Sequence, residues 1–231
     1  MINPLDKIPA SLRTRLLSAL VLIPVSVLVI YMGGLVLGLF ITALAFISLY
    51  EWLQMARKSE HVVTLAAAGL VYVPLSFLCG YVLREEFGFA SAILLALLIW
   101  GSDIAGYVFG KLIGGPKLVE AISPNKTWAG FFGAFFIPGL IAVGWVQLYD
   151  LYFDAQQGVV LVSIMSFALG ACIGIVGQAG DLLMSSFKRV VGVKDTGTLI
   201  PGHGGLLDRI DSLLLGMPVF LAFVSSLSYI L

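Results

Sequence analysis

Residues 158–211 read GVVLVSIMSFALGACIGIVGQAGDLLMSSFKRVVGVKDTGTLIPGHGGLLDRID, and in them an apolar run meets a charged segment. Residues 158–180 contain no charged side chain, and a run of about 20 such residues is long enough to cross a bilayer. Residues 185–211 then gather basic and acidic side chains: Lys188, Arg189, Lys194, Asp195, Asp208, Arg209 and Asp211. The charged segment is therefore expected at a membrane surface, where it suits a charged ligand.

The composition of the whole chain supports this interpretation. Apolar residues make up 60% and charged residues only 11%, whereas soluble domains carry roughly 25% charged residues. The chain is therefore expected to be an integral membrane protein. Its formal net charge is zero, so no nucleic-acid partner is expected. Because there is no linker, repeat or low-complexity tract, residues 1–231 are expected to form a single domain.

The apolar runs predict an all-α, polytopic membrane protein with about seven transmembrane helices. The expected spans are 15–32, 34–51, 62–83, 88–109, 129–149, 158–180 and 211–231. The first two are separated only by Gly33 and Gly34, so they could form a tight helical hairpin or one reorganised segment.

The distribution of Lys and Arg predicts the orientation of these spans, because cytoplasmic loops are enriched in both residues. With a cytoplasmic N-terminus, the seven spans leave only Arg84 of the 13 basic residues on the opposite side. We therefore expect a multi-pass protein of the cell (inner) membrane. Its two polar connections, 110–128 and 185–211, would both face the cytoplasm and could build one site.

Both connections carry residues that suit phosphate groups. Glycines flank His203 at positions 202, 204 and 205, and a glycine-rich backbone can approach a ligand closely. The basic side chains Lys188, Arg189, Lys194 and Arg209 can hold phosphate oxygens. A triphosphate or a phospholipid headgroup is the expected ligand.

The carboxylates predict a metal. Asp181 ends one expected span and Asp208 precedes the next, so the two could converge at the interface and hold Mg²⁺, which usually takes one or two protein carboxylates. Asp103 lies inside an apolar run, where an ionised side chain costs ~2.5–3.5 kcal/mol. That cost favours a functional or paired role for Asp103 over a hydrated carboxylate at a helix break.

The motifs closely resemble the signature of the phosphatidate cytidylyltransferases, also called CDP-diacylglycerol synthases. The matching residues are Ser185, Phe187, Lys188, Arg189, Lys194, Asp195, Pro201 to Gly205, and Asp208 to Asp211. Further segments also resemble the family: Arg15 to Ala19, Gly101 to Lys111, and Ser123 to Trp128. The similarity thus extends over most of the chain, and its most specific part is in the C-terminal half.

The resemblance implies a membrane enzyme, often a homodimer, that converts CTP and phosphatidate into CDP-diacylglycerol and pyrophosphate. It implies Mg²⁺ as cofactor, held by Asp181 and Asp208, and it leaves open whether a second, monovalent cation binds. Lys188 and Arg189 would act with these carboxylates in catalysis. The implied substrate-binding residues are Asp103, Ser123, Lys126, Thr127, Ser185, Lys194, Asp195, His203, Gly204, Gly205, Arg209 and Asp211.

The chain departs from the family pattern at two positions. The family has an acid at position 184 and more often Glu or Gln at 129, whereas this chain has Met184 and Ala129. One polar contact or metal-supporting group is therefore expected to be missing at position 184, and the chain could be an inactive paralogue.

The sequence is also compatible with different activities and with plainer roles for single residues. A CTP-dependent lipid or polyprenol kinase would use the same ingredients, and a secondary transporter would show inverted repeats, which the sequence lacks. Asp211 could cap the last helix as well as serve the site. Lys188 and Arg189 could be membrane anchors, and His203 and Lys126 could be plain loop residues.

Overall fold

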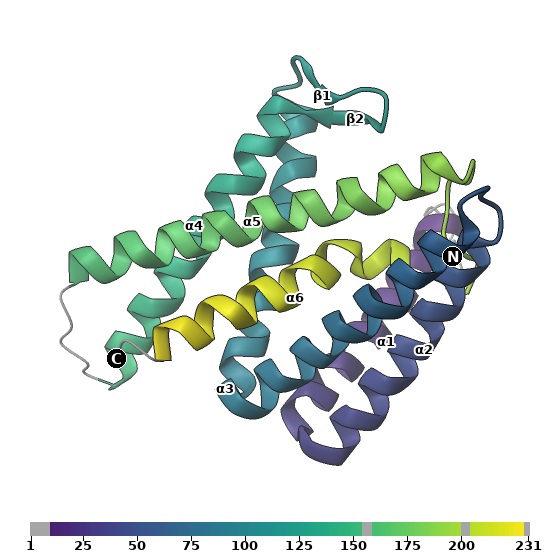
Figure 1. Cartoon of the computed structure of the whole chain (residues 1–231). Helices are drawn as coiled ribbons and strands as arrows, with labels where there is room; N and C mark the ends of the chain where they lie inside the picture. The colour runs from purple at the N-terminus through teal and green to yellow at the C-terminus, as the bar shows by residue number, and fades with distance from the viewer. Residues whose placement is uncertain (1–9, 154–158, 200–203, 229–231) are drawn as a thin grey trace, which may run out of the picture.

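The computed structural model describes residues 10–153, 159–199 and 204–228, and most of them are helical (Figure 1). The helices are α1 (Ala10–Met32), α2 (Gly34–Ala56), α3 (Val62–Leu112), α4 (Trp128–Phe153), α5 (Val159–Val190) and α6 (Leu207–Ser228). The strands β1 (Lys117–Val119) and β2 (Ser123–Thr127) form one antiparallel hairpin between α3 and α4. The expected all-α membrane architecture is confirmed, with this hairpin as an addition that the sequence did not predict.

Four helical segments in the described residues are long and apolar enough to cross a membrane: Gly34–Ala56, Val62–Leu112, Trp128–Leu148 and Val160–Val190. A shorter apolar helix covers Leu20–Met32. The expected count of seven spans is therefore not confirmed. One reason is that α3 joins the two spans expected at 62–83 and 88–109 into a single element.

The helix α3 is interrupted at Gly88. With 51 residues it would be about 76 Å long if straight, more than twice the ~30 Å of a bilayer core. Gly88 has φ 81° and ψ 174°, a conformation that residues with a side chain rarely adopt. Figure 1 shows the two halves of α3 running in different directions from this point. The break thus lies between the two expected spans.

Two apolar clusters hold the helices together. One contains Trp52, Phe77, Met184, Phe187 and Leu214 and joins α2, α3, α5 and α6. The other contains Leu83, Leu98, Ala142, Ile173 and Phe220 and joins α3, α4, α5 and α6. Because both clusters include α5, this helix and its charged C-terminal end are fixed relative to α3 and α6.

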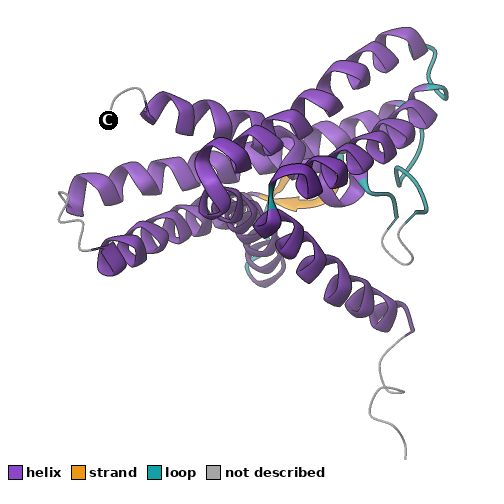
Figure 2. Cartoon of the chain, turned by 90° about the horizontal axis from the view of Figure 1, so that it is seen from below, coloured by secondary structure: helices purple, strands orange, loops and turns teal. Residues whose placement is uncertain are grey.

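The connection between α1 and α2 is a tight hairpin, the first of the two arrangements expected at Gly33 and Gly34. Gly33 has φ 65°, and the two charged residues that follow Leu83 close the turn. Arg84 donates through Nε to the Ile30 carbonyl (2.6 Å) and through Nη2 to the Tyr31 carbonyl (2.9 Å). The Glu85 carboxylate accepts the Gly34 N–H at 2.8 Å. The other end of α1 projects away from the remaining helices (Figure 2).

These contacts predict that Arg84→Gln destabilises the protein. The substitution removes two charge-assisted hydrogen bonds to carbonyls at the end of α1, each worth about 1.5–3 kcal/mol. The melting temperature of the detergent-purified protein should therefore fall. Glu86→Gln is the matched control, since Glu86 is exposed and two residues away. Equal melting temperatures for the two variants would contradict the role given to Arg84.

Candidate functional site

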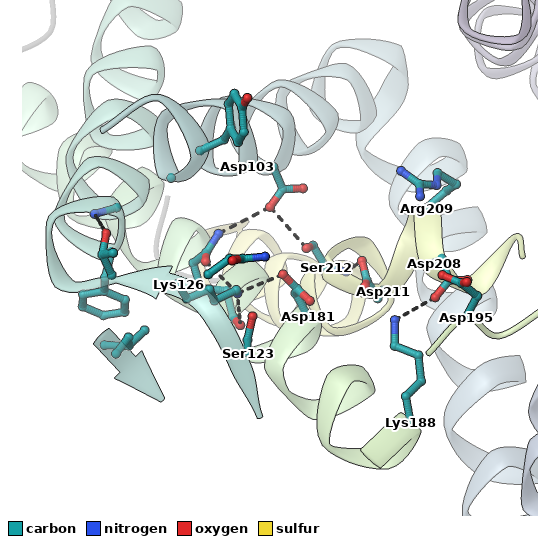
Figure 3. A pocket seen from close by; sticks show the side chains of 18 residues that line it. Asp103, Ser123, Lys126, Asp181, Lys188, Asp195, Asp208, Arg209, Asp211 and Ser212 are labelled. Atoms are coloured by element: carbon teal, nitrogen blue, oxygen red, sulfur yellow. Dashed lines mark hydrogen bonds and ion pairs between the residues drawn. The ribbon is translucent and has the colours of Figure 1, made fainter. Parts of the chain in front are cut away.

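A polar cavity of about 410 Å³ lies where α3, the β-hairpin, α5 and the start of α6 meet (Figure 3). This volume is in the range of small-molecule sites. Its lining contains many of the residues expected from the sequence: Asp103, Ser123, Lys126, Thr127, Asp181, Lys188, Asp195, Asp208, Arg209 and Asp211. The fold therefore brings the two polar connections together around one cavity.

The first charged pair in the cavity joins the hairpin to α5. Lys126 on β2 forms an ion pair with Asp181 on α5, with 2.9 Å between Nζ and Oδ2. The same Nζ donates to the side-chain oxygen of Gln178 at 2.8 Å. The Ser185 hydroxyl donates to the other Asp181 oxygen at 3.1 Å. The hairpin thus holds a lysine inside the cavity, and both oxygens of Asp181 have a partner.

Asp103 reaches the cavity from α3 and is also paired. The Gln178 amide nitrogen and the Ser212 hydroxyl both donate to Asp103 Oδ1, each at 3.4 Å. Gln178 therefore contacts Lys126 with its oxygen and Asp103 with its nitrogen. These contacts account for a carboxylate in an apolar run, because a polar group in such surroundings needs partners.

The second charged pair joins α5 to α6. Lys188 Nζ lies 2.7 Å from Asp208 Oδ1, and the two side chains are 13% and 6% exposed. Asp208 Oδ2 also accepts the backbone N–H groups of Thr196 (2.8 Å) and Gly205 (3.1 Å). Burial alone would raise the pKa of Asp208, but Lys188 and the two N–H donors outweigh it and lower the pKa below its usual value. Asp208 is therefore held as a carboxylate.

The helices extend further into the charged segment than expected. The helix α5 continues ten residues beyond the expected end at 180, so Ser185, Lys188 and Arg189 lie on its last turns. It continues because Met184 and Phe187 pack into the apolar cluster around Trp52. The helix α6 begins at Leu207, so the interpretation of Asp211 as its cap is wrong, and Asp211 lies one turn inside it.

The other predicted residues lie outside the cavity lining or have a further structural role. Arg189 donates through Nε to the Ile122 carbonyl at 3.3 Å, toward the hairpin turn. Thr127 caps α4, because its hydroxyl oxygen accepts the Gly130 N–H at 3.1 Å. Within the described residues, the cavity lining lacks Ser185, Arg189, Lys194, Gly204 and Gly205. His203 lies outside the described residues.

Sequence reasoning missed three polar residues that organise the site. Gln178 bridges Lys126 and Asp103, and Ser212 contacts Asp103. Glu51, on α2, is 5% exposed and accepts the backbone N–H groups of Leu206 and Leu207. Gln178 and Glu51 both lie within expected apolar spans. Because a polar group in such a run needs partners, as Asp103 does, their positions were a signal that could have identified them.

The donors in the cavity fit a hard cation. Asp181 and Asp208 supply carboxylate oxygens, and Mg²⁺ needs only one or two of these when phosphate and water complete its shell. Within the described residues, no three His, Cys, Asp or Glu side chains come together in a metal-binding group. The donor set therefore suits a cation that binds together with a phosphate ligand, and not a closed protein cage.

Comparison with known proteins gives a consistent result. The model of the cytidylyltransferase family matches residues 13–68 and 58–227. A phosphatidate cytidylyltransferase of Brucella suis is 30% identical over an alignment that covers 88% of this chain and 90% of that protein. One from Rickettsia bellii is 31% identical, with 96% and 94% covered. One from Staphylococcus epidermidis is 36% identical over 77% of this chain, but only 65% of that protein is covered.

The departure at position 184 has a structural explanation. Met184 is 1% exposed and packs in the cluster with Trp52, Phe77 and Phe187. Its side chain does not line the cavity formed by the described residues. The missing acid therefore leaves an apolar contact in the core in this chain, and the Lys126–Asp181 and Lys188–Asp208 pairs form without it.

We predict that Met184→Glu lowers stability by several kcal/mol, because a carboxylate would be buried in an apolar cluster. Met184→Leu conserves the volume and should cost less than about 1.5 kcal/mol. Thermal unfolding of the two purified variants measures the difference. A Met184→Glu protein as stable as wild type would show that this position accepts the acid of the family pattern.

Proposed function

The chain belongs to the cytidylyltransferase family, and from this premise we propose that it is a phosphatidate cytidylyltransferase. It transfers the cytidylyl group of CTP to phosphatidate, giving CDP-diacylglycerol and pyrophosphate, a step of phospholipid biosynthesis. The observation that carries the proposal is the polar cavity with its two lysine–carboxylate pairs at the ends of apolar helices. Such a cavity offers cations to the phosphate groups of a soluble triphosphate and of a lipid headgroup.

The reaction is a direct displacement at phosphorus. An oxygen of the phosphatidate phosphate forms a bond to the α-phosphorus of CTP, and the bond from that phosphorus to the bridging oxygen of the β-phosphate breaks. Pyrophosphate leaves with the electron pair. The attacking phosphate is already an anion near neutral pH, so no strong general base is needed. The chemistry then depends on positioning and on offsetting negative charge.

The residues of the cavity supply both the positioning and the positive charge that the reaction needs. Lys126 and Lys188 are held in the cavity by the carboxylates that they contact, so their positive charges are already oriented before substrate binds. Arg209 also lines the cavity and adds a third cation for phosphate oxygens. Asp103 and Gln178 keep Lys126 in place from the side of α3 and α5.

We further propose that Asp181 and Asp208 hold Mg²⁺. When bound, it would neutralise charge on the triphosphate and on the departing pyrophosphate. The oxygen donors of the two carboxylates support this assignment, because they suit a hard cation. A second, monovalent cation would act only as an activator. Comparing turnover in salts of different monovalent cations would test this role.

Location and assembly can be proposed as well. The distribution of Lys and Arg supports a multi-pass protein of the cell (inner) membrane with both polar connections in the cytoplasm. A homodimer is supported by the family resemblance. The molar mass of the protein in detergent or nanodiscs tests the dimer.

A product assay tests the function. Purified protein is incubated with CTP labelled in the cytosine, phosphatidate and Mg²⁺, and both the lipid and the released phosphate compound are identified. Labelled CDP-diacylglycerol together with pyrophosphate is the expected result. A kinase would attack the γ-phosphorus, so it would release CDP and leave the lipid unlabelled. No turnover of either kind would refute the proposal.

We predict that Asp208→Asn and Asp181→Asn each lower turnover by about 10³-fold or more, because each removes a charge that the cation and its lysine partner require. The double variant should be little worse than either single variant, since residues that act as a unit are strongly non-additive. Glu120→Gln, at an exposed site near the hairpin turn, should keep wild-type turnover. A monodisperse size-exclusion profile confirms folding. Near wild-type turnover by well-folded Asp208→Asn would refute the two-carboxylate site.

The orientation gives a separate prediction. Cysteines introduced as Lys117→Cys and Lys194→Cys, in a background without Cys79 and Cys172, should react with a membrane-impermeant reagent only after the cells are lysed. A cysteine at position 85, beside Arg84, should react in intact cells. Labelling at 117 or 194 before lysis would overturn the cytoplasmic placement.

A further inference from the structure

The helix α2 carries a buried carboxylate that the proposed reaction does not use. Glu51 lies near the C-terminal end of α2, is 5% exposed, and is not among the described residues that line the cavity. Its hydrogen-bond partners among the described residues are neutral donors, and none is a lysine or arginine. An ionised group this deeply buried is costly unless its oxygens are well bonded, so its partners indicate its role.

Two of these partners are the backbone N–H groups of Leu207, the first residue of α6, and of Leu206 just before it. The Leu206 N–H donates to Oε1 and the Leu207 N–H to Oε2, each at 2.9 Å. Because α6 begins at Leu207, these donors have no partner inside the helix. A negative charge at this position also interacts favourably with the helix dipole. Glu51 therefore caps α6 from another helix and fixes where α6 starts.

The third partner links Glu51 to the cavity. The Thr196 hydroxyl lies 3.1 Å from Glu51 Oε2 and 3.0 Å from Asp208 Oδ2. A hydroxyl has one proton, and Asp208 already accepts N–H groups from Thr196 and Gly205 and contacts Lys188. The hydroxyl can therefore donate to only one of the two carboxylates at a time, while the Thr196 backbone N–H stays on Asp208. The same threonine is held by both carboxylates.

The backbone packs directly on Glu51. A Cβ atom at Gly205 would lie 2.6 Å from Oε2, and one at Gly197 would lie 2.8 Å from Oε1. Both contacts are closer than real Cβ atoms come to a neighbour, so a side chain at either position would displace the Glu51 carboxylate. The Glu51 carboxylate therefore lies close to the backbone at both Gly197 and Gly205. Figure 3 shows Asp208 and Asp195 together on the side of the cavity where α6 begins.

We propose that Glu51 is a positioning residue: through Thr196 and the first turn of α6 it holds Asp208 in the orientation that the nucleotidyl transfer requires. The expected effect on turnover rests on the proposed function. The expected effect on the start of α6 rests on the hydrogen bonds alone. In this arrangement Glu51 acts on turnover although it does not touch the cavity.

The test compares Glu51→Gln with Ser48→Ala. Ser48 lies one turn earlier on α2, is fully buried, and its hydroxyl has no hydrogen-bond partner in the described part of the chain. Glu51→Gln keeps the size but replaces one acceptor oxygen with an NH₂ group that faces N–H donors. We expect kcat to fall by ~10–100-fold, as for residues that orient a metal-site ligand, with smaller changes in KM for CTP and phosphatidate. Ser48→Ala should retain wild-type kcat and KM.

Hydrogen–deuterium exchange supplies a readout that needs no activity. In Glu51→Gln, peptides containing the Leu206 and Leu207 amides should exchange faster than in wild type, while peptides from α4 should not. If Glu51→Gln does not fold, Thr196→Val removes the bridging hydroxyl at nearly constant volume, and the same fall in kcat is expected.

Wild-type exchange at Leu206 and Leu207 in Glu51→Gln would overturn the proposal. Faster exchange with wild-type kcat would overturn it too, because the cap would then not serve the site. Failure of the proposed function is distinguishable, since in that case wild type and Ser48→Ala would make no CDP-diacylglycerol either.

Discussion

The pairs Lys126–Asp181 and Lys188–Asp208 are the interactions on which the arrangement of the cavity depends. Each joins elements that are far apart in the chain: the hairpin to α5 in one pair, and α5 to α6 in the other. A half-buried charge without its partner would be strongly destabilising. The pairs therefore determine how the polar ends of the helices meet, and they place both signs of charge where a triphosphate must bind.

Much of this protein could be predicted from local sequence patterns. The length of the apolar runs indicated a helical membrane protein, because spanning a bilayer requires that length and a closed backbone hydrogen-bond pattern. The spacing of the charged residues between Ser185 and Asp211 indicated the family. Both features depend on residues close together in the chain, and both were confirmed by the structure and the comparisons.

The remaining features depend on contacts between distant segments. The ends of α5 and α6 could not be predicted, because α5 is extended by the packing of Met184 and Phe187 on Trp52, and α6 starts where Glu51 accepts its first N–H groups. The hairpin could not be predicted either, because its Lys126 is held by partners on α5. The roles of Gln178 and Glu51 could have been suspected from their apolar surroundings, but their partners could not be identified from the sequence.

The length of α5 has a consequence for how the enzyme meets its lipid. With 32 residues α5 is about 48 Å long, well beyond the ~30 Å of the hydrocarbon core, and its last turns carry Asp181 and Lys188. Lipid substrate and lipid product can therefore both keep their acyl chains in one leaflet throughout the reaction. Encounter is then lateral diffusion in two dimensions, and the concentration that governs the rate is the mole fraction of phosphatidate in the surface. The saturation of the enzyme with phosphatidate is therefore changed by dilution with an inert lipid and not by dilution with buffer.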